Sequence, residues 1–432
     1  MKPLFPTSPL AESSTPPIGE YACLIGLDWG DAQHAVSLLE RGQSTVERQM
    51  LPSQPEQVHR WARSLAERFH GAPVAVALET SKGPIVDLLL GYEWITIYPV
   101  HPATSRRYSK AFTPSGAAND QPDADNLLEI LHQHRDRLRA LLPQDQSTKH
   151  LAALVSLRRR IVDARTKLSN ELTSLLKSYF PQALLLTGEE RHAKIALEFL
   201  QRWPNLESLK KARPQTVRSF YYRHHVRRPE LVEKRLQLIQ EAQSLSQDRV
   251  LIQTSELQLR YLLGQFRALE VSLREIEAEI DRVFTAHGDR EIFQSLPAAG
   301  AAMAPRLCAL FGTDRERWHH VSELQKYYGV APVIEASGKR RWVHWRWNAP
   351  AFQRQTLVEW AGITVRYCPW AKAYYWKQRE RQKGHSAILR SLAFKWLRIL
   401  YRCWKDRTPY NDARYLEQLK AKGSYLPSLI PA

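Results

Sequence analysis

Cysteine is scarce in this sequence. Its 432 residues include only 4 cysteines, which lie far apart in the chain (Cys23, Cys308, Cys368 and Cys403). Their spacing matches no metal-binding motif. We therefore expect reduced, packed thiols of the kind found in cytoplasmic proteins.

Long apolar runs are also missing. No run approaches the roughly 20 residues that a membrane-spanning helix needs, so we expect no membrane partner. Residues 1–19 are rich in proline and serine and lack the apolar core of a signal peptide. They predict a flexible tail on a protein that stays in the cytoplasm.

Acidic residues are outnumbered by basic ones. There are 44 Asp and Glu against 62 Lys and Arg, which gives a formal net charge of +18. Such an excess favours a polyanionic partner, most often nucleic acid. The length allows two or three domains, and 44% hydrophobic residues are enough to build their cores.

The acids that stand out follow predicted buried strands. The strand at 21–28 ends in Asp28, and the strand at 73–79 ends in Glu79. Asp120 and Asp123 lie three residues apart where a helix begins, and so share one face of it. Asp125 points away from Asp123 and is left out of the set.

Carboxylates are the ligands that hard divalent ions require. Two Mg²⁺ ions held about 3.5–4 Å apart by four such groups could activate a nucleophile and stabilise the leaving oxygen in phosphodiester chemistry. A single acid at a strand end is more often a cap or a turn residue. Four acids in this order favour a metal site, with Asp28, Glu79, Asp120 and Asp123 as its ligands.

The surrounding pattern predicts a mixed α/β sheet with helices on its faces. The order is similar to that of the ribonuclease H fold found in Holliday-junction resolvases and many transposases. The expected strands are 21–28, 35–39, 45–51, 73–79 and 94–98, and the expected helices are 55–69, 84–91 and one that starts at Asp120.

The middle of the chain predicts long helices. Residues 148–180 form one, and its outer face carries Arg158, Arg159 and Arg160, which we expect to contact nucleic acid. From Leu259 to Val283 apolar residues recur in alternating steps of three and four, the pattern of a coiled coil. The partner of this seam is either helix 148–180 or another subunit. Residues 181–250 between these helices are basic and less regular.

Near the C-terminus the motif Gly329-Val-Ala-Pro332 is followed by Ser337-Gly338. With the four acids in order and spacing, this stretch resembles the insertion-sequence transposases of the "one-ten" type, also called bridge-RNA-guided recombinases. The segments Ala393–Tyr401 and Thr408–Tyr410 also resemble the C-terminal end of that family. The resemblance covers roughly residues 21–410.

The resemblance implies a domain layout. A resolvase-like catalytic domain of ribonuclease H fold is followed by a long coiled-coil helical region with a basic insert. A mainly α C-terminal transposase domain, which carries the serine nucleophile, completes it. The expected boundaries are a tail at 1–19, the catalytic domain at 20–145, the helical region at 146–290, the transposase domain at 291–415 and a tail at 416–432.

The resemblance also implies an activity. It is site-specific DNA recombination in a bacterial cytoplasm, guided by a structured non-coding RNA and performed by a homo-oligomer, a dimer or a tetramer. Two Mg²⁺ ions on the acids would activate Ser337, whose attack leaves a 5′-phosphoserine link and a free 3′-hydroxyl. Rejoining then needs no ATP, because the phosphodiester energy is retained.

The sequence around Ser337 departs from the family. Many members have a Lys-x-Gly-Asn run after the serine, where this chain has Trp345-Arg346-Trp347-Asn348. Before Asp120, Ala118-Asn119 replaces a Lys-Thr pair. Basic residues and indoles nevertheless crowd the region, as nucleic-acid binding requires. The residues we expect to contact nucleic acid here are Gly338, Lys339, Arg340, Arg341 and Arg346.

The tryptophans divide into two groups. We expect Trp342, Trp345 and Trp347 to alternate along one strand and to gather near one face, where they could stack bases. Trp360, Trp396 and Trp404 are expected to pack in a helical core.

Two other functions stay open. One is a metal-dependent, junction-resolving endonuclease in which water attacks and Ser337 only shapes the DNA-binding surface. The other is a nucleic-acid-binding protein that has kept the fold without catalysis. The first would leave hydrolysed ends and no covalent adduct, and the second would bind without cleaving.

Overall fold

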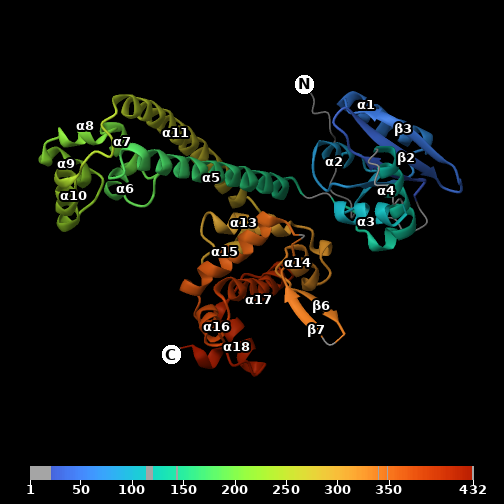
Figure 1. The fold of residues 1–432 in the computed structure, drawn as a ribbon. Helices are drawn as coiled ribbons and strands as arrows, with labels where there is room; N and C mark the ends of the chain where they lie inside the picture. Colours follow the sequence, from blue (N-terminus) through green and yellow to red (C-terminus); the bar gives the residue numbers. More distant parts are fainter. Residues whose placement is uncertain (1–20, 113–119, 143–144, 339, 348, 431–432) are drawn as a thin grey trace. The chain divides into compact units, whose positions relative to one another are not determined.

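The computed structural model describes residues 21–112, 120–142, 145–338, 340–347 and 349–430. The chain divides into two compact units, residues 1–143 and 144–432. Figure 1 shows a sheet with its helices in the first unit and helices almost throughout the second. Within the described ranges, no helix combines the length and the apolar character that crossing a membrane requires.

A five-stranded mixed sheet forms the centre of the first unit, as the sequence predicted. Its order is β3-β2-β1-β4-β5. β1, β2 and β3 are antiparallel neighbours, whereas β4 and β5 run parallel to β1. The strands are β1 (Cys23–Asp28), β2 (Gln33–Glu40), β3 (Val46–Pro52), β4 (Val74–Leu78) and β5 (Ile95–Pro99).

Helices cover both faces of this sheet. On one face, Ile25 and Leu27 of β1 pack in a core with Trp61 of α1 (Pro55–Arg68) and Ile85 of α2 (Pro84–Leu89). On the other face, alanines of β4 pack against Leu127 and neighbouring residues of α4 (Asp120–His134), beside α3 (Pro102–Phe112) and the short η1 (Arg135–Arg137). Small side chains on that face let α4 lie close to the sheet.

α4 touches β1 through backbone atoms at Gly26. A Cβ atom on Gly26 would lie 2.0 Å from the carbonyl oxygen of Ala124 and 2.5 Å from the amide nitrogen of Leu128. Real Cβ atoms do not come that close to backbone, and backbone cannot rotate away as a side chain can. The position of α4 therefore depends on residue 26 having no side chain.

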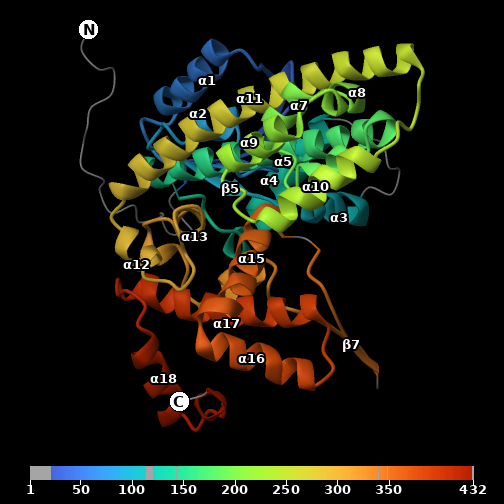
Figure 2. The same ribbon diagram turned by 90° about the vertical axis from the view of Figure 1, so that its left-hand side faces the viewer.

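Two long antiparallel helices organise the second unit. α5 (Gln146–Tyr179) and α11 (Arg249–Thr285) lie side by side in Figures 1 and 2. Arg158 Nη2 lies 2.6 Å from Glu277 Oε1, and Arg165 Nη1 lies 3.0 Å from Glu270 Oε1. Of the two partners left open by the sequence, the apolar seam of α11 thus faces the helix of its own chain.

The apolar seam of α11 is buried except near its middle. Leu269 and Ile276 are only partly covered. The buried members of the seam are Leu259, Leu262, Phe266, Leu273, Ile280 and Val283.

A helical insert caps one end of the α5–α11 pair, where the sequence predicted less regular structure. Its core combines Phe199, Trp203 and Phe220 with Leu172 of α5 and Phe266 of α11. Each of these helices has 13 residues or fewer, so the spacing of apolar residues shows only a short helical pattern in each. The helices are α6 (Ala183–Leu186), α7 (Lys194–Arg202), α8 (Leu206–Lys210), α9 (Pro214–Arg223) and α10 (Pro229–Glu241).

A second helical core forms at the other end of the pair. It includes Trp360, Trp396 and Trp404, as predicted, and all three indoles are fully buried. The strands β6 (Val333–Ser337) and β7 (Arg340–His344) form a separate hairpin. The helices are α12 (Arg290–Gln294), α13 (Met303–Phe311), η2 (Arg315–Arg317), α14 (Val321–Tyr327), α15 (Ala351–Tyr367), α16 (Pro369–Glu380), α17 (His385–Lys405), α18 (Asp412–Ala421) and η3 (Pro427–Leu429).

The expected tail at 416–432 is structured as far as residue 430. α18 continues to Ala421, and Leu426 is 1% exposed. Apolar side chains of this segment, including Leu416 and Leu419, pack against the core at this end of the unit. The four cysteines are free and buried, and burial raises the pKa of Cys23 to about 12 and that of Cys403 to about 11.

A buried polar network joins the first turn of α5 to the segment that follows α11. Asp145 caps α5 by accepting from the Thr148 amide at 2.8 Å, and Thr148 Oγ1 lies 2.9 Å from His287 Nε2. His287 Nδ1 accepts the amide proton of Asp289 at 3.1 Å, and Asp289 accepts from Arg315. His287 is 4% exposed, and burial lowers its pKa.

This network predicts a pH dependence of stability. Because the pKa of His287 is lower in the folded state, the unfolded chain binds more protons below about pH 6.5. The free energy of unfolding should therefore decrease as pH falls from 7.5 through 6.5 toward the folded pKa. Chemical denaturation of the full chain at several pH values measures the slope, which His287→Asn should reduce.

The matched control is His320→Asn, because His320 is exposed. It should keep the wild-type slope. An unchanged slope in His287→Asn would show that other groups cause the pH dependence.

The contact at Gly26 gives a second prediction. Gly26→Ala should lower the free energy of unfolding of the first unit by about 1–3 kcal/mol or more, because the added methyl group must push α4 off β1. Gly264→Ala is the control, since Gly264 lies in α11 with no atom within 4 Å of an added Cβ. There the change should be neutral or stabilising, by up to about 1 kcal/mol. Equal changes of melting temperature in Gly26→Ala and Gly264→Ala would contradict the proposed contact between α4 and Gly26.

Candidate functional site

Two of the predicted acids lie at neighbouring strand ends. Asp28 is the last residue of β1, and Glu79 directly follows β4. β1 and β4 are parallel neighbours in which Leu27 faces Leu78, so the two acids occupy the next position of the register. Both are partly buried.

Strand alternation assigns these acids to one face of the sheet. Asp28 lies two residues beyond Gly26, and Glu79 two residues beyond Ala77, so each pair shares a face. Gly26 is the residue that α4 contacts, and Ala77 packs with Leu127 of α4. The two acids therefore lie on the side of the sheet that α4 covers.

Asp120 and Asp123 lie in the first turn of α4. Ala124, which follows Asp123, is the residue whose carbonyl oxygen lies over Gly26. This contact brings the first turn of α4 to the end of β1, where Asp28 is located. The structure describes Asp120 only as the first residue of the helix.

Asp125 has a structural role that the sequence did not reveal. Its carboxylate accepts a hydrogen bond from Ser37 Oγ of β2 at 2.5 Å and from Arg48 Nε of β3 at 3.0 Å. Gln121 Nε2 donates to the same Ser37 Oγ at 2.8 Å. These bonds tie the start of α4 to two strands of the sheet. Asp125 therefore positions the helix.

The donor chemistry of the acid set fits a hard divalent ion. Asp28, Glu79 and Asp123 offer carboxylate oxygens from one face and one end of the sheet, which is the ligand type of Mg²⁺, Mn²⁺ and Ca²⁺. Within the described side chains no group of three or more His, Cys, Asp or Glu residues is close enough to hold a metal.

Ser337 lies at the tip of an exposed hairpin. It ends β6, faces Arg340 across the turn and is exposed to solvent. Gly338 has a φ of +55°, a conformation that glycine adopts at little cost. The Ser337 hydroxyl makes no hydrogen bond to any residue within the described ranges, so none of them is held as its general base. Lys339 lies outside those ranges.

The histidine on this hairpin is engaged elsewhere. His344 Nε2 lies 2.7 Å from Glu335 Oε1, and His344 Nδ1 donates to the carbonyl oxygen of Trp345 at 2.9 Å. The bond to that carbonyl and the bond to Glu335 raise the pKa of His344. His344 faces Val333, four cross-strand pairs away from Ser337 on the same face. It stabilises the base of the hairpin and does not reach Ser337.

The basic residues predicted to bind nucleic acid differ in their surroundings. Arg340 and Arg341 are exposed on β7 and point to opposite faces of the hairpin. Arg158 pairs with Glu277 of α11, and Arg159 Nη2 lies 2.9 Å from Asp163. Arg160 is exposed. Of the three arginines on α5, Arg160 is therefore the one most open to a ligand.

The expected strand of alternating tryptophans is wrong in its second half. β7 ends at His344, so Trp345 and Trp347 lie beyond it, although their rings are 6.5 Å apart. Trp342 stays on the hairpin and donates from Nε1 to Glu335 Oε2 at 2.8 Å. Residue alternation could not indicate where the strand stops.

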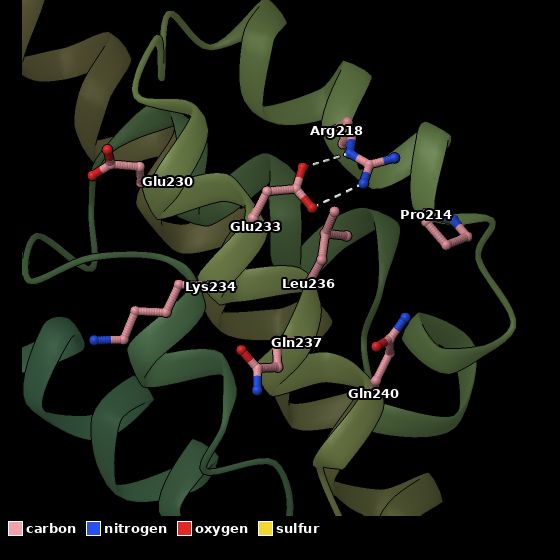
Figure 3. A pocket seen from close by; sticks show the side chains of 8 residues that line it. All are labelled: Pro214, Arg218, Glu230, Glu233, Lys234, Leu236, Gln237 and Gln240. Atoms are coloured by element: carbon pink, nitrogen blue, oxygen red, sulfur yellow. Dashed lines mark hydrogen bonds and ion pairs between the residues drawn. The ribbon is translucent and has the colours of Figure 1, made fainter.

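A groove lies between α9 and α10, apart from these residues. It has a volume of about 600 Å³. Figure 3 shows Arg218 and Glu233 paired across it, with Glu230 and Lys234 on the same helix face. Its two basic and two acidic side chains balance, so the groove has no preference for an anion. The lining residues are Pro214, Arg218, Glu230, Glu233, Lys234, Leu236, Gln237 and Gln240.

Comparison with known proteins covers both units. Residues 25–181 match a family model described as a transposase, of the DEDD type of IS110 elements. Residues 290–376 match another, described as the transposase IS116/IS110/IS902 family. The first range contains the four predicted acids, and the second contains Ser337.

Similar proteins extend over most of the chain. A mini-circle protein of Streptomyces coelicolor, named as the transposase for IS117, is 25% identical over 397 residues, which are 90% of this chain and 95% of that protein. An uncharacterized 43.6 kDa protein of insertion element IS110 from the same organism is 24% identical, with the same coverage. An uncharacterized 42 kDa protein of insertion element IS900 from Mycobacterium paratuberculosis is 24% identical over 67% of this chain and 73% of its own length.

The fold, the acids and these matches define a DNA transposase, an enzyme that acts on DNA. The chain belongs to the IS110 family of insertion-sequence transposases. Membership in the DEDD class implies dependence on a divalent metal ion.

The carboxylates of Asp28, Glu79 and Asp123 at one end of the sheet predict that divalent ions stabilise the first unit. With MgCl₂ or MnCl₂ at about 100 times the dissociation constant, binding should add about 2.7 kcal/mol to the free energy of unfolding of this unit. That is enough to raise the melting temperature of the unit by several degrees. Asp28→Asn should lose most of that increase relative to EDTA. Differential scanning calorimetry of the full chain measures the change.

Asp31→Asn is the matched control, because Asp31 is exposed just beyond the end of β1. It should keep the increase. An equal increase in wild type and in Asp28→Asn would mean that the ion binds elsewhere.

Proposed function

We propose that this transposase is a site-specific DNA recombinase of an insertion sequence. Asp28, Glu79, Asp120 and Asp123 would hold two Mg²⁺ ions, and Ser337 would be the nucleophile. The observation that carries the proposal is the position of Asp28 and Glu79 on neighbouring ends of parallel strands. The helix that covers them begins with the other two acids.

The proposal includes a division of labour between domains. Residues 20–145 would be a ribonuclease H-like catalytic domain, which the strand order supports. Residues 146–290 would be the helical region with its basic insert. Residues 291–415 would be the transposase domain that carries the serine.

The reaction would use Ser337 Oγ to attack a DNA phosphate. A bond forms between Oγ and phosphorus, the bond from phosphorus to the 3′-oxygen breaks, and the serine proton is lost to solvent. The 3′-oxygen leaves and takes up a proton, so the strand ends are a 5′-phosphoserine and a 3′-hydroxyl. Attack by another 3′-hydroxyl reverses these steps and joins the new strand without ATP.

Among the described residues of the hairpin, His344 is engaged with Glu335 and does not activate Ser337. Bound divalent ions would polarise the phosphate and favour the ionised hydroxyl. The four carboxylates would position the ions, while the exposed tip of the hairpin presents Ser337 to the strand. Arg340 and Arg341 would contact neighbouring phosphates.

Acids and serine belong to different units of the chain. We propose a composite active site that assembles in a homo-oligomer, a dimer or a tetramer, when DNA is bound. Cleavage would then stay off until the complex is complete. The structured guide RNA comes from the family resemblance, and the net charge of +18 is compatible with it. DNA as substrate and four buried free thiols suit a bacterial cytoplasm.

A metal-dependent, junction-resolving endonuclease is the second candidate. One observation favours it, namely that Ser337 has no hydrogen-bond partner within the described ranges that would activate it. Water held at the acids would then attack the phosphate, and no adduct would form. The two candidates differ in the chemical state of the cleaved 5′ end.

A denaturing gel distinguishes the candidates. The full chain is incubated with Mg²⁺, labelled junction DNA carrying the element ends, and the non-coding RNA transcribed beside the gene. Wild type should form a protein–DNA adduct, because the phosphoserine bond survives denaturation. Ser337→Ala and Asp28→Asn should form none.

Ser156→Ala and Asp31→Asn are the controls, because both residues are exposed and lie outside the proposed site. Both should form the adduct as wild type does. Cleavage that persists in Ser337→Ala without an adduct in any sample would support the endonuclease and refute the serine mechanism.

A further inference from the structure

Two guanidinium groups lie over one tryptophan at the base of the β6–β7 hairpin. The Cζ atom of Arg354, in α15, lies 4.3 Å from the centre of the Trp345 ring, and that of Arg390, in α17, lies 4.2 Å from it. Arg346 follows Trp345 directly in the chain. Residues from the hairpin and from two helices therefore meet at one indole.

Arg354 is fixed in place by its neighbours. Its Nη1 donates to the carbonyl oxygen of Arg346 at 2.9 Å. A Cβ atom added to Gly329 would lie 3.3 Å from Arg354 Cδ and 2.4 Å from Ala349 Cβ, so the stem of Arg354 packs against backbone. The side chain is partly buried and is preorganised for a ligand.

The positive charge of this cluster is not neutralised by the described part of the chain. None of the described carboxylates forms an ion pair with Arg346, Arg354 or Arg390. The Nε atom of Arg346 is buried and has no hydrogen-bond partner among the described atoms.

Acids on the adjoining elements are engaged elsewhere. Glu359 of α15 accepts from Arg306 at 2.8 Å and from Gln355 at 2.5 Å, and Glu335 of β6 is held by His344 and Trp342. Burial and the nearby charge of Arg354 lower the pKa of Arg390. Holding Arg354 and Arg390 together without an anion is unfavourable, and a bound anion would relieve that cost.

We propose that Arg346, Arg354 and Arg390, gathered at Trp345, form a binding site for a backbone phosphate of DNA. Guanidinium groups bind phosphate through paired N–H donors, and their planes stack on aromatic rings. The Trp345 ring is already covered by two guanidinium groups, so it orients them and does not stack a base. Trp347 is 80% exposed and is free to do so.

The position of the site determines which phosphate it binds. Arg340, which faces Ser337, and His344, which precedes Trp345, are four residues apart along β7. At about 3.4 Å per residue this is about 14 Å. The cluster would therefore hold a phosphate other than the one that Ser337 attacks. That the bound phosphate belongs to the strand that Ser337 cleaves rests on the proposed function. The existence of the phosphate site does not depend on that function.

The first test is a binding measurement on the full chain without divalent ions, so that no cleavage occurs. Fluorescence anisotropy with a labelled DNA duplex is recorded from 50 to 300 mM salt. Arg354→Gln/Arg390→Gln should weaken binding about tenfold or more at 100 mM salt, because charged hydrogen bonds are lost. The slope of log affinity against log salt should decrease by about 1. Arg354→Lys/Arg390→Lys should recover part of the affinity, because it keeps the positive charge but lacks the planar guanidinium group.

Arg366→Gln/Arg381→Gln is the matched control, because it removes the same charge from exposed positions of the same helical core. It should change affinity less than threefold. Equal losses in the two double variants would overturn the site, because the effect would then be general electrostatics. Melting temperatures of all variants check that the fold is intact.

A second measurement needs no variant. Phenylglyoxal modifies accessible arginines, and mass spectrometry of the wild-type chain shows whether DNA protects Arg354 and Arg390 but not Arg366. Protection by RNA of equal length and not by DNA would overturn the assignment to DNA. Absence of protection by either would overturn the site.

The outcomes separate this site from the proposed chemistry. Loss of DNA affinity in Arg354→Gln/Arg390→Gln would support the site even if Ser337→Ala still cleaves. Unchanged affinity and protection, together with a serine adduct, would refute the site and leave the recombinase proposal intact.

Discussion

The antiparallel pairing of α5 and α11 is the interaction on which the second unit depends. Each helix contributes side chains to both cores of that unit, for example Leu151 and Leu172 from α5, and Ile280 and Phe266 from α11. A shift of one helix along the other would disturb both cores at once. The partly exposed pair of Arg158 and Glu277 adds about 1 kcal/mol at most, so its main effect is on the relative register of the helices.

A different constraint governs the first unit. Its sheet places two acids at one corner because β1 and β4 are parallel neighbours, and the remaining acids arrive on a helix. That helix is held by a backbone contact at Gly26 and by the hydrogen bonds of Asp125 to Ser37 and Arg48. The corner is thus built by residues that are not part of the proposed acid set. Loss of one of them would leave the carboxylates present but misplaced.

Much of the first unit could be predicted from the sequence because strands such as β1 and β4 are short apolar runs with clear ends. The same signal predicted Asp28 and Glu79, since each follows such a run. The role of Asp125 could not be predicted, because it depends on Ser37 and Arg48, which are distant in sequence. The backbone contact at Gly26 was equally hidden, since a lone glycine in a strand indicates only that something lies close.

The second unit was harder to predict. Heptad spacing predicted the seam of α11 and left its partner open, because a seam looks the same whether its partner is in the same chain or another. The insert of α6 to α10 combines helices of 13 residues or fewer that are separated by prolines such as Pro204 and Pro214, so each shows only a short stretch of helical spacing. The arginines over Trp345 come from α15 and α17, and only the folded chain brings them together.

The absence of a side chain at Gly26 also has a genetic consequence. Every single-base missense change in a glycine codon adds a side chain, and here even the smallest side chain would collide with α4. Codon 26 therefore has no conservative neighbour that point mutation can reach. In a mobile element whose copies drift independently, a substitution at this codon is a direct route from an active copy to a silent one.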